Sequence, residues 1–213
     1  MPDPARLHRF DRRERLLHWT HAGAVLVLLA SGFALYQPDL AELIGRRPLV
    51  RDVHVDTALA WGAALLAQAL LGGRALRDRL RELGDPAAPR FNRGQKTHAT
   101  IQAALAVLVS LTGALIWLGE RHTGLRVGGA VALHDVLALA TLALLLGHLY
   151  LAVLHPATRH ALRGMTRGEV DAAWAREQHP AWAAEDLGES GERGSGEADR
   201  GPARPYDDRM VAS

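Results

Sequence analysis

Cysteine is absent from the 213 residues of this chain. Its absence excludes disulfide bonds, thiolate-bound iron–sulfur clusters and cysteine-ligated zinc, so a cofactor must be held by histidine, methionine or carboxylate side chains. No internal repeat and no nucleic-acid-binding motif is apparent. The apolar segments also lack a charged stripe at helical spacing, which disfavours a soluble bundle of amphipathic helices. The formal net charge is only +2, so the distribution of charge is more informative than its sum.

Four long apolar blocks stand out, although the mean hydropathy of the whole chain is only -0.03. They cover residues 16–36, 53–73, 99–118 and 130–155. Each block has about 20 residues or slightly more, which is enough to cross a bilayer as a helix. The sequence therefore predicts an all-α integral membrane four-helix bundle, in a membrane domain of residues 1–184. Residues 185–213 are acidic and poor in apolar side chains, and we expect a disordered tail there.

The charge of the connecting segments predicts the orientation in the membrane. Arginine is abundant before the first block, between the second and third blocks, and after the fourth, and it is scarcer in the other two connections. The positive-inside rule therefore places both termini and the middle connection in the cytoplasm. The first block is too long for a signal peptide and lacks a small-residue cleavage site, so we expect it to be retained as a span.

Two histidines of the fourth block, His134 and His148, are fourteen residues apart. On an α-helix this offset is about 1400° of rotation, within roughly 40° of a whole number of turns, and about 21 Å of rise. Both rings therefore share one helix face, one near each edge of a hydrocarbon core about 30 Å thick. A titratable ring inside lipid is a candidate functional residue by default. Two such rings at opposite depths are what a pair of haems would require.

Partners for these two rings are expected at matching depths on the first two blocks. In the predicted topology His54 lies at the periplasmic level of His134, and His18 lies at the cytoplasmic level of His148. Haem b takes two axial ligands on opposite faces, and neutral imidazole suits iron. On spacing alone His18 and His21, one helical turn apart, remain alternatives.

Two carboxylates flank the periplasmic pair. Asp56 and Asp135 could accept a hydrogen bond from a ring N–H and so orient the imidazoles. Both could equally be carboxylates at the water boundary. In the same way, a lone histidine near a membrane interface can be a headgroup contact or a packed polar residue instead of a ligand, and His98 at the cytoplasmic edge is expected to be interfacial.

Three stretches resemble the cytochrome b (gamma) subunit of membrane-bound respiratory formate dehydrogenase, within a broader two-haem family that includes the cytochrome b of nickel–iron hydrogenase. They are RLLHW at residues 15–19, RFNRGQK at residues 90–96, and residues 134–182, which contain GHLYLAVLHP and RGMTRGEVDAAWAREQHPAW. The last two stretches are the more specific, and they favour formate dehydrogenase over hydrogenase. Gln178 departs from the family's terminal His-His-Pro pattern.

The resemblance implies two haem b groups with four axial histidines. By position, the periplasmic-side ligands are His54 and His134, and the cytoplasmic-side ligands are His18 and His148. These positions agree with the pairs expected from depth, and they select His18 over His21.

The resemblance also implies a quinone pocket beside the cytoplasmic-side haem, for menaquinone or ubiquinone. By position it includes Asn92 and Gly94, with Gln95 and Lys96 adjacent, near His148. An amide group and a backbone N–H can donate to a quinone carbonyl, while nearby cytoplasmic water supplies protons. The alternative is that FNRGQK is a plain turn in which Gly94 leads into the third span.

The implied function is electron transfer in the bacterial inner membrane. A molybdenum- or tungsten-containing catalytic (alpha) subunit would oxidise formate in the periplasm, and an iron–sulfur (beta) subunit would pass electrons through the two b haems to quinone on the cytoplasmic side. This chain would carry no residue that oxidises formate. Two alternatives remain: the cytochrome b subunit of a hydrogenase or related oxidoreductase, and a haem-free membrane transporter or scaffold whose histidines bind metal or protons.

Overall fold

The computed structural model describes residues 6–37, 39–40 and 45–188. Its four long helices are α1 (Arg12–Tyr36), α3 (Arg47–Leu71), α5 (Arg93–Arg121) and α6 (Ala130–Leu149), and a π-helical turn, η2 (Tyr150–Leu154), continues α6. All four are long and apolar enough to cross a membrane, with mean hydropathies of 1.4, 1.2, 2.1 and 2.2 over their most apolar windows. The predicted all-α, four-helix membrane architecture is therefore confirmed.

Three of the long helices begin before the apolar blocks that predict them, because their first turns are polar. Asp11 and Glu14 cap α1 reciprocally, each side chain accepting from the other's backbone N–H at 2.8 Å. Asn92 and Gln95 cap α5 in the same way, at 3.1 and 2.9 Å. Such a capping box satisfies N–H groups that the first helical turn leaves without partners. The helix α6 instead begins after Gly129, whose φ of 80° favours glycine.

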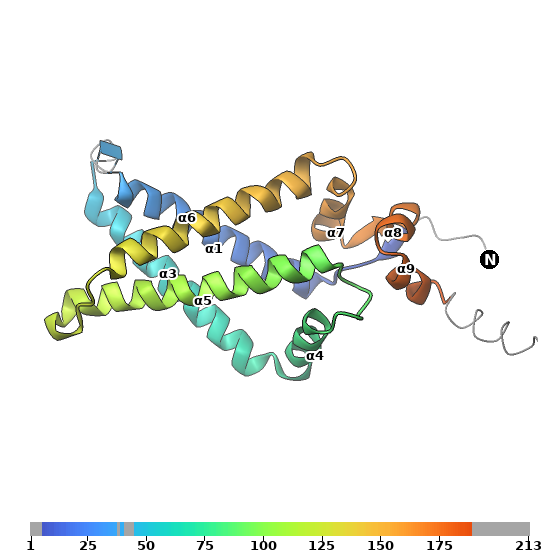
Figure 1. The fold of residues 1–213 in the computed structure, drawn as a ribbon, viewed down its shortest axis with the longest axis horizontal. Helices are drawn as coiled ribbons and strands as arrows, with labels where there is room; N and C mark the ends of the chain where they lie inside the picture. Colours follow the sequence, from blue (N-terminus) through green and yellow to red (C-terminus); the bar gives the residue numbers. More distant parts are fainter. Residues whose placement is uncertain (1–5, 38, 41–44, 189–213) are drawn as a thin grey trace, which may run out of the picture.

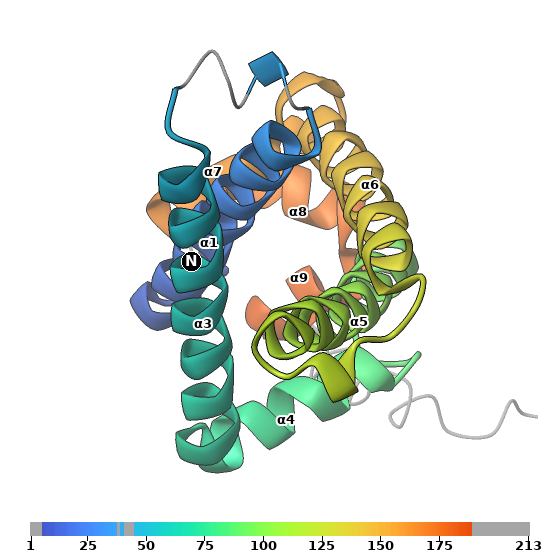
Figure 2. The ribbon, with the colours of Figure 1, turned by 90° about the vertical axis from the view of Figure 1, so that its left-hand side faces the viewer.

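The long helices form two hairpins. The helices α1 and α3 pack against each other, and so do α5 and α6 (Figure 1). Figure 2, which looks along the bundle, shows the hairpin of α1 and α3 on one side and the hairpin of α5 and α6 on the other. The helix α4 (Gly73–Gly84) runs from the end of α3 towards α5. Residues of α6 that point towards α1 and α3 therefore lie between the two hairpins.

Short elements surround these helices, most of them at one end of the bundle. They are β1 (Arg6–His8), η1 (Thr123–Leu125), η3 (Arg159–Ala161), α7 (Leu162–Arg167), β2 (Glu169–Asp171), α8 (Ala172–Gln178) and α9 (Pro180–Asp186). The strands β1 and β2 pair antiparallel, with Leu7 opposite Val170, and this ribbon was not predicted from the sequence. The helix α9 includes the first two residues of the predicted tail, and residues 189–213 lie outside the described part of the chain.

The buried apolar core lies in what we call the cap, residues 6–10 and 159–187. Its central residues are Leu7, Val170, Ala172, Trp174, Ala175, Trp182 and Ala183. The long helices, by contrast, expose large apolar side chains, among them Leu16 at 69% and Leu154 at 67%. Apolar exposure on this scale marks surface that something other than water covers, and here lipid covers it. The cap is thus the one part of the described structure that folds around a water-excluding core of its own.

Arg9, only 3% exposed, joins the cap to the connection that precedes α5. Its Nη2 donates to the Arg90 carbonyl at 2.9 Å, and Nη2 of Arg90 donates back to the Arg9 carbonyl at 2.7 Å. Nη2 of Arg9 also lies 3.2 Å from Nε2 of His179. Burial, reinforced by the charge of Arg9, lowers the pKa of His179 to about 4. His179 is therefore neutral at pH 7 and accepts a hydrogen bond from Arg9.

The low pKa of His179 predicts that acid loosens the cap. In the unfolded chain this imidazole takes up a proton near its usual pKa of about 6.5, whereas in the folded cap it does so only near 4. The unfolded state therefore binds more protons in this window, and the cap loses stability as the pH falls from 6.5 to 4. The protection factors of the α8 and α9 amides, which are corrected for the intrinsic pH dependence of exchange, should fall by at most about tenfold per pH unit.

The matched control is His179→Gln, which keeps a hydrogen-bond acceptor but does not titrate. The protection factors of its α8 and α9 amides should depend less on pH between 6.5 and 4 than those of the wild-type protein. Identical pH profiles in the two proteins would show that His179 is not the titrating group.

Candidate functional site

Four histidines on three long helices form two pairs. His54 of α3 and His134 of α6 have ring centres 6.4 Å apart and ring planes at 79°. His18 of α1 and His148 of α6 have ring centres 6.3 Å apart and planes at 57°. The helix α6 therefore contributes one ring to each pair, as the fourteen-residue spacing predicts. The structure brings together the same residues that the sequence paired by depth.

The separation within each pair suits one metal ion between two imidazoles. Two metal–nitrogen bonds of about 2 Å, each lengthened by roughly 1 Å from the nitrogen to the ring centre, place ring centres about 6 Å apart. Among the described residues no group of three or more His, Cys, Asp or Glu side chains could hold a metal ion. Each pair thus offers two ligands and no more. This set fits a haem iron, which takes its other ligands from the porphyrin, and it does not fit tetrahedral zinc.

In the His54–His134 pair, a hydroxyl group lies within hydrogen-bond distance of Nδ1 of each ring. The Oγ of Ser31 lies 2.9 Å from Nδ1 of His54, and the Oγ1 of Thr112 lies 2.9 Å from Nδ1 of His134. Both hydroxyls are buried, at 8% and 6% exposure. Of the two alternatives for Asp56 and Asp135, the structure does not show the one in which they orient the rings, because these Nδ1 atoms contact hydroxyls of neighbouring helices.

His21, the alternative to His18 on spacing, faces α3. Its Nδ1 accepts from Nε1 of Trp61 at 2.7 Å, and its Nε2 lies 3.0 Å from Nε2 and 3.3 Å from Oε1 of Gln68. A neutral imidazole has one donor and one acceptor nitrogen, so this pair of partners satisfies the ring completely. His18 has no hydrogen-bond partner of this kind among the described residues. Its ring lies edge-on to Trp19 and beside His148.

His98 belongs to the site, although the sequence suggested only an interfacial role. Its ring stacks on that of His148, with centres 5.0 Å apart and planes at 16°. His98 lies one helical turn after Gly94 and Gln95 in α5. The start of α5 is therefore adjacent to the His18–His148 pair, which connects this pair with the RFNRGQK stretch.

Two side chains of the RFNRGQK stretch use their oxygens to cap α5. Oδ1 of Asn92 and Oε1 of Gln95 accept backbone N–H groups. In the described part of the chain their amide NH2 groups make no hydrogen bond, so both remain available as donors. Gly94 is an ordinary helical residue, and a Cβ at its position would lie 3.4 Å from Oδ1 of Asn92. The stretch therefore leads into α5 as a capped helix start, as the plain-turn alternative also expects, and it carries two amide groups that can donate.

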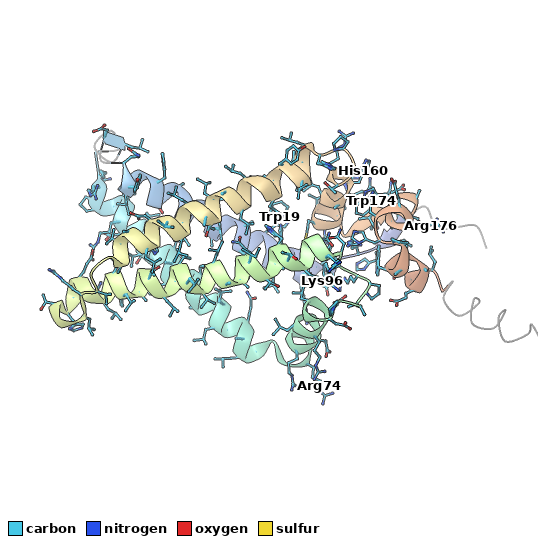
Figure 3. All side chains as sticks on the ribbon, viewed as in Figure 1. Trp19, Arg74, Lys96, His160, Trp174 and Arg176 are labelled. Atoms are coloured by element: carbon cyan, nitrogen blue, oxygen red, sulfur yellow. The ribbon has the colours of Figure 1, made fainter. Side chains whose placement is uncertain are left out.

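Lys96 fixes this helix start to the preceding connection. It is 8% exposed and lies at the end of the bundle that is next to the cap (Figure 3). Its Nζ donates to the carbonyl oxygens of Asp85 and Ala88, at 2.5 and 2.8 Å. A buried ammonium group that is bonded in this way supports the local backbone and is not presented to a ligand.

Sequence reasoning missed Ser31, Thr112 and His98. A signal for the first two does exist, because each is a hydroxyl residue followed by glycine inside an apolar block (Ser31-Gly32 and Thr112-Gly113). His98 gives no such signal, since its contact with His148 depends on how α5 packs against α6.

Comparisons with known proteins find similar chains. A family model described as prokaryotic cytochrome b561 matches residues 9–168. The formate dehydrogenase cytochrome b556(fdo) subunit of Escherichia coli strain K12 is 24% identical over 195 residues, which cover 82% of this chain and 90% of that protein. The formate dehydrogenase cytochrome b556 subunit of Haemophilus influenzae is 24% identical over 210 residues, covering 85% and 84% respectively.

Proposed function

We propose that this chain, which belongs to the prokaryotic cytochrome b561 family, is the membrane cytochrome b subunit of a formate dehydrogenase and delivers electrons to quinone. As a family member it is a multi-pass, haem b-binding protein of the bacterial inner membrane. The observation that best supports the proposal is that four imidazoles form two pairs, with ring centres 6.4 Å apart in one pair and 6.3 Å apart in the other. Two pairs at different depths suit electron transfer across a membrane better than a single site would.

In this proposal each residue of the site has a defined task. His54 and His134 hold one haem b towards the periplasmic side, and His18 and His148 hold a second towards the cytoplasmic side. Haem b, when bound in these two places, supplies one-electron transfer. The chain itself contributes the distance, the orientation and the apolar surroundings. The fourteen-residue offset from His134 to His148 separates the two ligands of α6 by about 21 Å along the helix axis.

The quinone would bind at the start of α5. Asn92 and Gln95 each have an amide NH2 group that can donate to a quinone carbonyl, and backbone N–H groups of the first helical turn, including that of Gly94, are nearby. The stacked rings of His98 and His148 lie one helical turn further on. Menaquinone and ubiquinone both present two carbonyl oxygens and suit this set of donors.

The partners follow from the same family relation. The names of the Escherichia coli and Haemophilus influenzae proteins make each a subunit of formate dehydrogenase. By analogy, this chain would receive electrons from an iron–sulfur subunit, which is supplied by a molybdenum- or tungsten-containing catalytic subunit in the periplasm. The positive-inside distribution of arginine supports this orientation, with both termini in the cytoplasm.

The first test compares two histidines one helical turn apart on α1. His18→Ala should lose one of two b haems per chain, because one axial ligand is removed. His21→Ala should keep both, since His21 is bonded to Trp61 and Gln68. His148→Ala should resemble His18→Ala, and His134→Ala should lose the other haem. Haem content per chain of the purified protein, by pyridine haemochrome assay, measures the outcome.

Two results would contradict the ligand assignment. One is a His18→Ala protein that retains two haems, and the other is a His21→Ala protein that loses one. A wild-type chain that purified without haem would instead favour the alternative of a haem-free transporter or scaffold.

The second test separates the quinone role of Asn92 from its role in capping α5. Asn92→Asp retains the oxygen that accepts the Gln95 N–H but loses the amide donor. In membranes that contain the partner subunits, formate should reduce the haems of this variant normally. Reoxidation by added quinone should be slower by about five- to tenfold, the loss expected for one hydrogen bond. The measurement is stopped-flow absorbance of the b haems.

The control for this test is Asp78→Asn, which makes the opposite exchange, from carboxylate to amide, at an exposed position of α4 where Asp78 pairs with Arg81. It should leave quinone reoxidation at the wild-type rate. Reoxidation of Asn92→Asp at the wild-type rate would move the quinone site elsewhere. Reduction of the haems by hydrogen but not by formate would favour the hydrogenase alternative.

A further inference from the structure

Two hydroxyl–glycine pairs occupy equivalent places in the two hairpins. Ser31-Gly32 lies in α1 and faces His54 of α3, which is 23 residues further along the chain. Thr112-Gly113 lies in α5 and faces His134 of α6, which is 22 residues further along. In each hairpin the first helix therefore presents the same two features to a histidine of the second helix.

The hydrogen-bond geometry of Ser31 defines the tautomer of His54. The Oγ of Ser31 lies 2.7 Å from the carbonyl oxygen of Val27 and 3.3 Å from that of Leu28, and its only hydrogen is donated to these backbone acceptors. At 2.9 Å from Nδ1 of His54, the same oxygen can therefore only accept. Nδ1 of His54 carries the proton, and the lone pair of the ring is left on Nε2, where a metal can bind it.

Thr112 repeats this arrangement with a different side chain. Its Oγ1 donates to the carbonyl oxygen of Leu108 at 2.9 Å and lies 2.9 Å from Nδ1 of His134. Its hydrogen is likewise occupied, so the hydroxyl accepts from the ring. His134 is thus held as the same Nδ1–H tautomer as His54, and both Nε2 atoms are free for a shared metal.

The glycines make room for the two rings. A Cβ built on Gly32 would lie 3.3 Å from Cε1 of His54, and one on Gly113 would lie 3.2 Å from Cε1 of His134. Both distances are tighter than ordinary van der Waals contact, so a larger residue would push the ring away from the hydroxyl. Each glycine keeps one edge of the imidazole close to the helix that carries its acceptor.

The His18–His148 pair has no such support. In the described part of the chain neither ring accepts or donates a hydrogen bond to a hydroxyl group. His18 contacts Trp19, with ring centres 5.3 Å apart, and His148 stacks on His98 at 5.0 Å. The two pairs therefore differ in their surroundings, although their ring separations are nearly equal.

We propose that Ser31 and Thr112 are positioning residues that fix His54 and His134 as Nδ1–H imidazoles and lower the reduction potential of the haem they hold relative to the other haem. This inference rests on the proposed function. A ligand that donates its second N–H is a more basic imidazole and favours the oxidised iron. The lower potential on the periplasmic side directs electrons inward, towards the His18–His148 pair.

The test is a spectroelectrochemical titration of the purified protein with two b haems. Ser31→Ala and Thr112→Val should each raise the potential of one haem, the one that His54→Ala removes, and leave the other unchanged. The equilibrium constant for electron exchange between the haems should change by about fivefold for each hydrogen bond lost. The double variant should show the larger shift.

Two kinds of control make the result specific. Thr141→Val removes a hydroxyl from a residue that is 7% exposed and lies in α6 midway between His134 and His148. Among the residues that the structure describes, this hydroxyl bonds to the Leu137 carbonyl and to no histidine. It should leave both potentials unchanged. Ser31→Thr and Thr112→Ser retain the hydroxyl and should keep the wild-type potentials. If these residues only filled space, the hydroxyl-retaining variants would shift the potentials as Ser31→Ala and Thr112→Val do.

The outcomes separate this inference from the proposed function. Selective loss of the periplasmic-side haem in Ser31→Ala, with retention in Ser31→Thr, also supports the positioning role. Unchanged potentials in the double variant, or equal shifts of both haems, would overturn it while leaving the cytochrome intact. A wild-type protein without two b haems would instead overturn the proposed function.

Discussion

An imidazole ring inside the hydrocarbon layer is costly unless its two nitrogens have partners, and this requirement organises the membrane part of the molecule. Trp61 and Gln68 satisfy both nitrogens of His21, while Ser31 and Thr112 each satisfy one nitrogen of a paired ring. What remains for His54 and His134 is one nitrogen per ring, Nε2, which the proposed haem iron would bind. The polar chemistry is thus collected between the helices, and leucine and valine cover the outside.

The cap and the start of α5 together stabilise one end of the helix bundle. Arg9 and Arg90 exchange hydrogen bonds between the N-terminal segment and the α4–α5 connection, and Lys96 fastens the same connection to the first turn of α5. The amide groups of Asn92 and Gln95 are consequently held on a rigid helix start. In the proposed function these amides would bind a lipid-soluble quinone, and such preorganised donors would favour its binding.

The sequence predicted the features that depend on periodicity and failed on those that depend on packing. Hydropathy found four spans, and the spacing of His134 and His148 correctly anticipated that α6 would serve two pairs. Hydropathy missed the polar first turns, because Asp11 and Asn92 begin their helices through capping bonds. Carboxylates, at Asp56 and Asp135, were only one of two alternatives that the sequence left open beside the rings. Within a span a hydroxyl is cheaper to bury than a charge, and Ser31 and Thr112 lie beside Nδ1 of His54 and His134.

The central claim, that each histidine pair holds one haem iron through two imidazoles, is tested most directly by electron paramagnetic resonance with spin quantitation of the oxidised, purified protein. The account predicts two low-spin ferric signals of bis-imidazole type, each integrating to one spin per chain. A single such signal, or a high-spin signal from iron with one protein ligand, would contradict it.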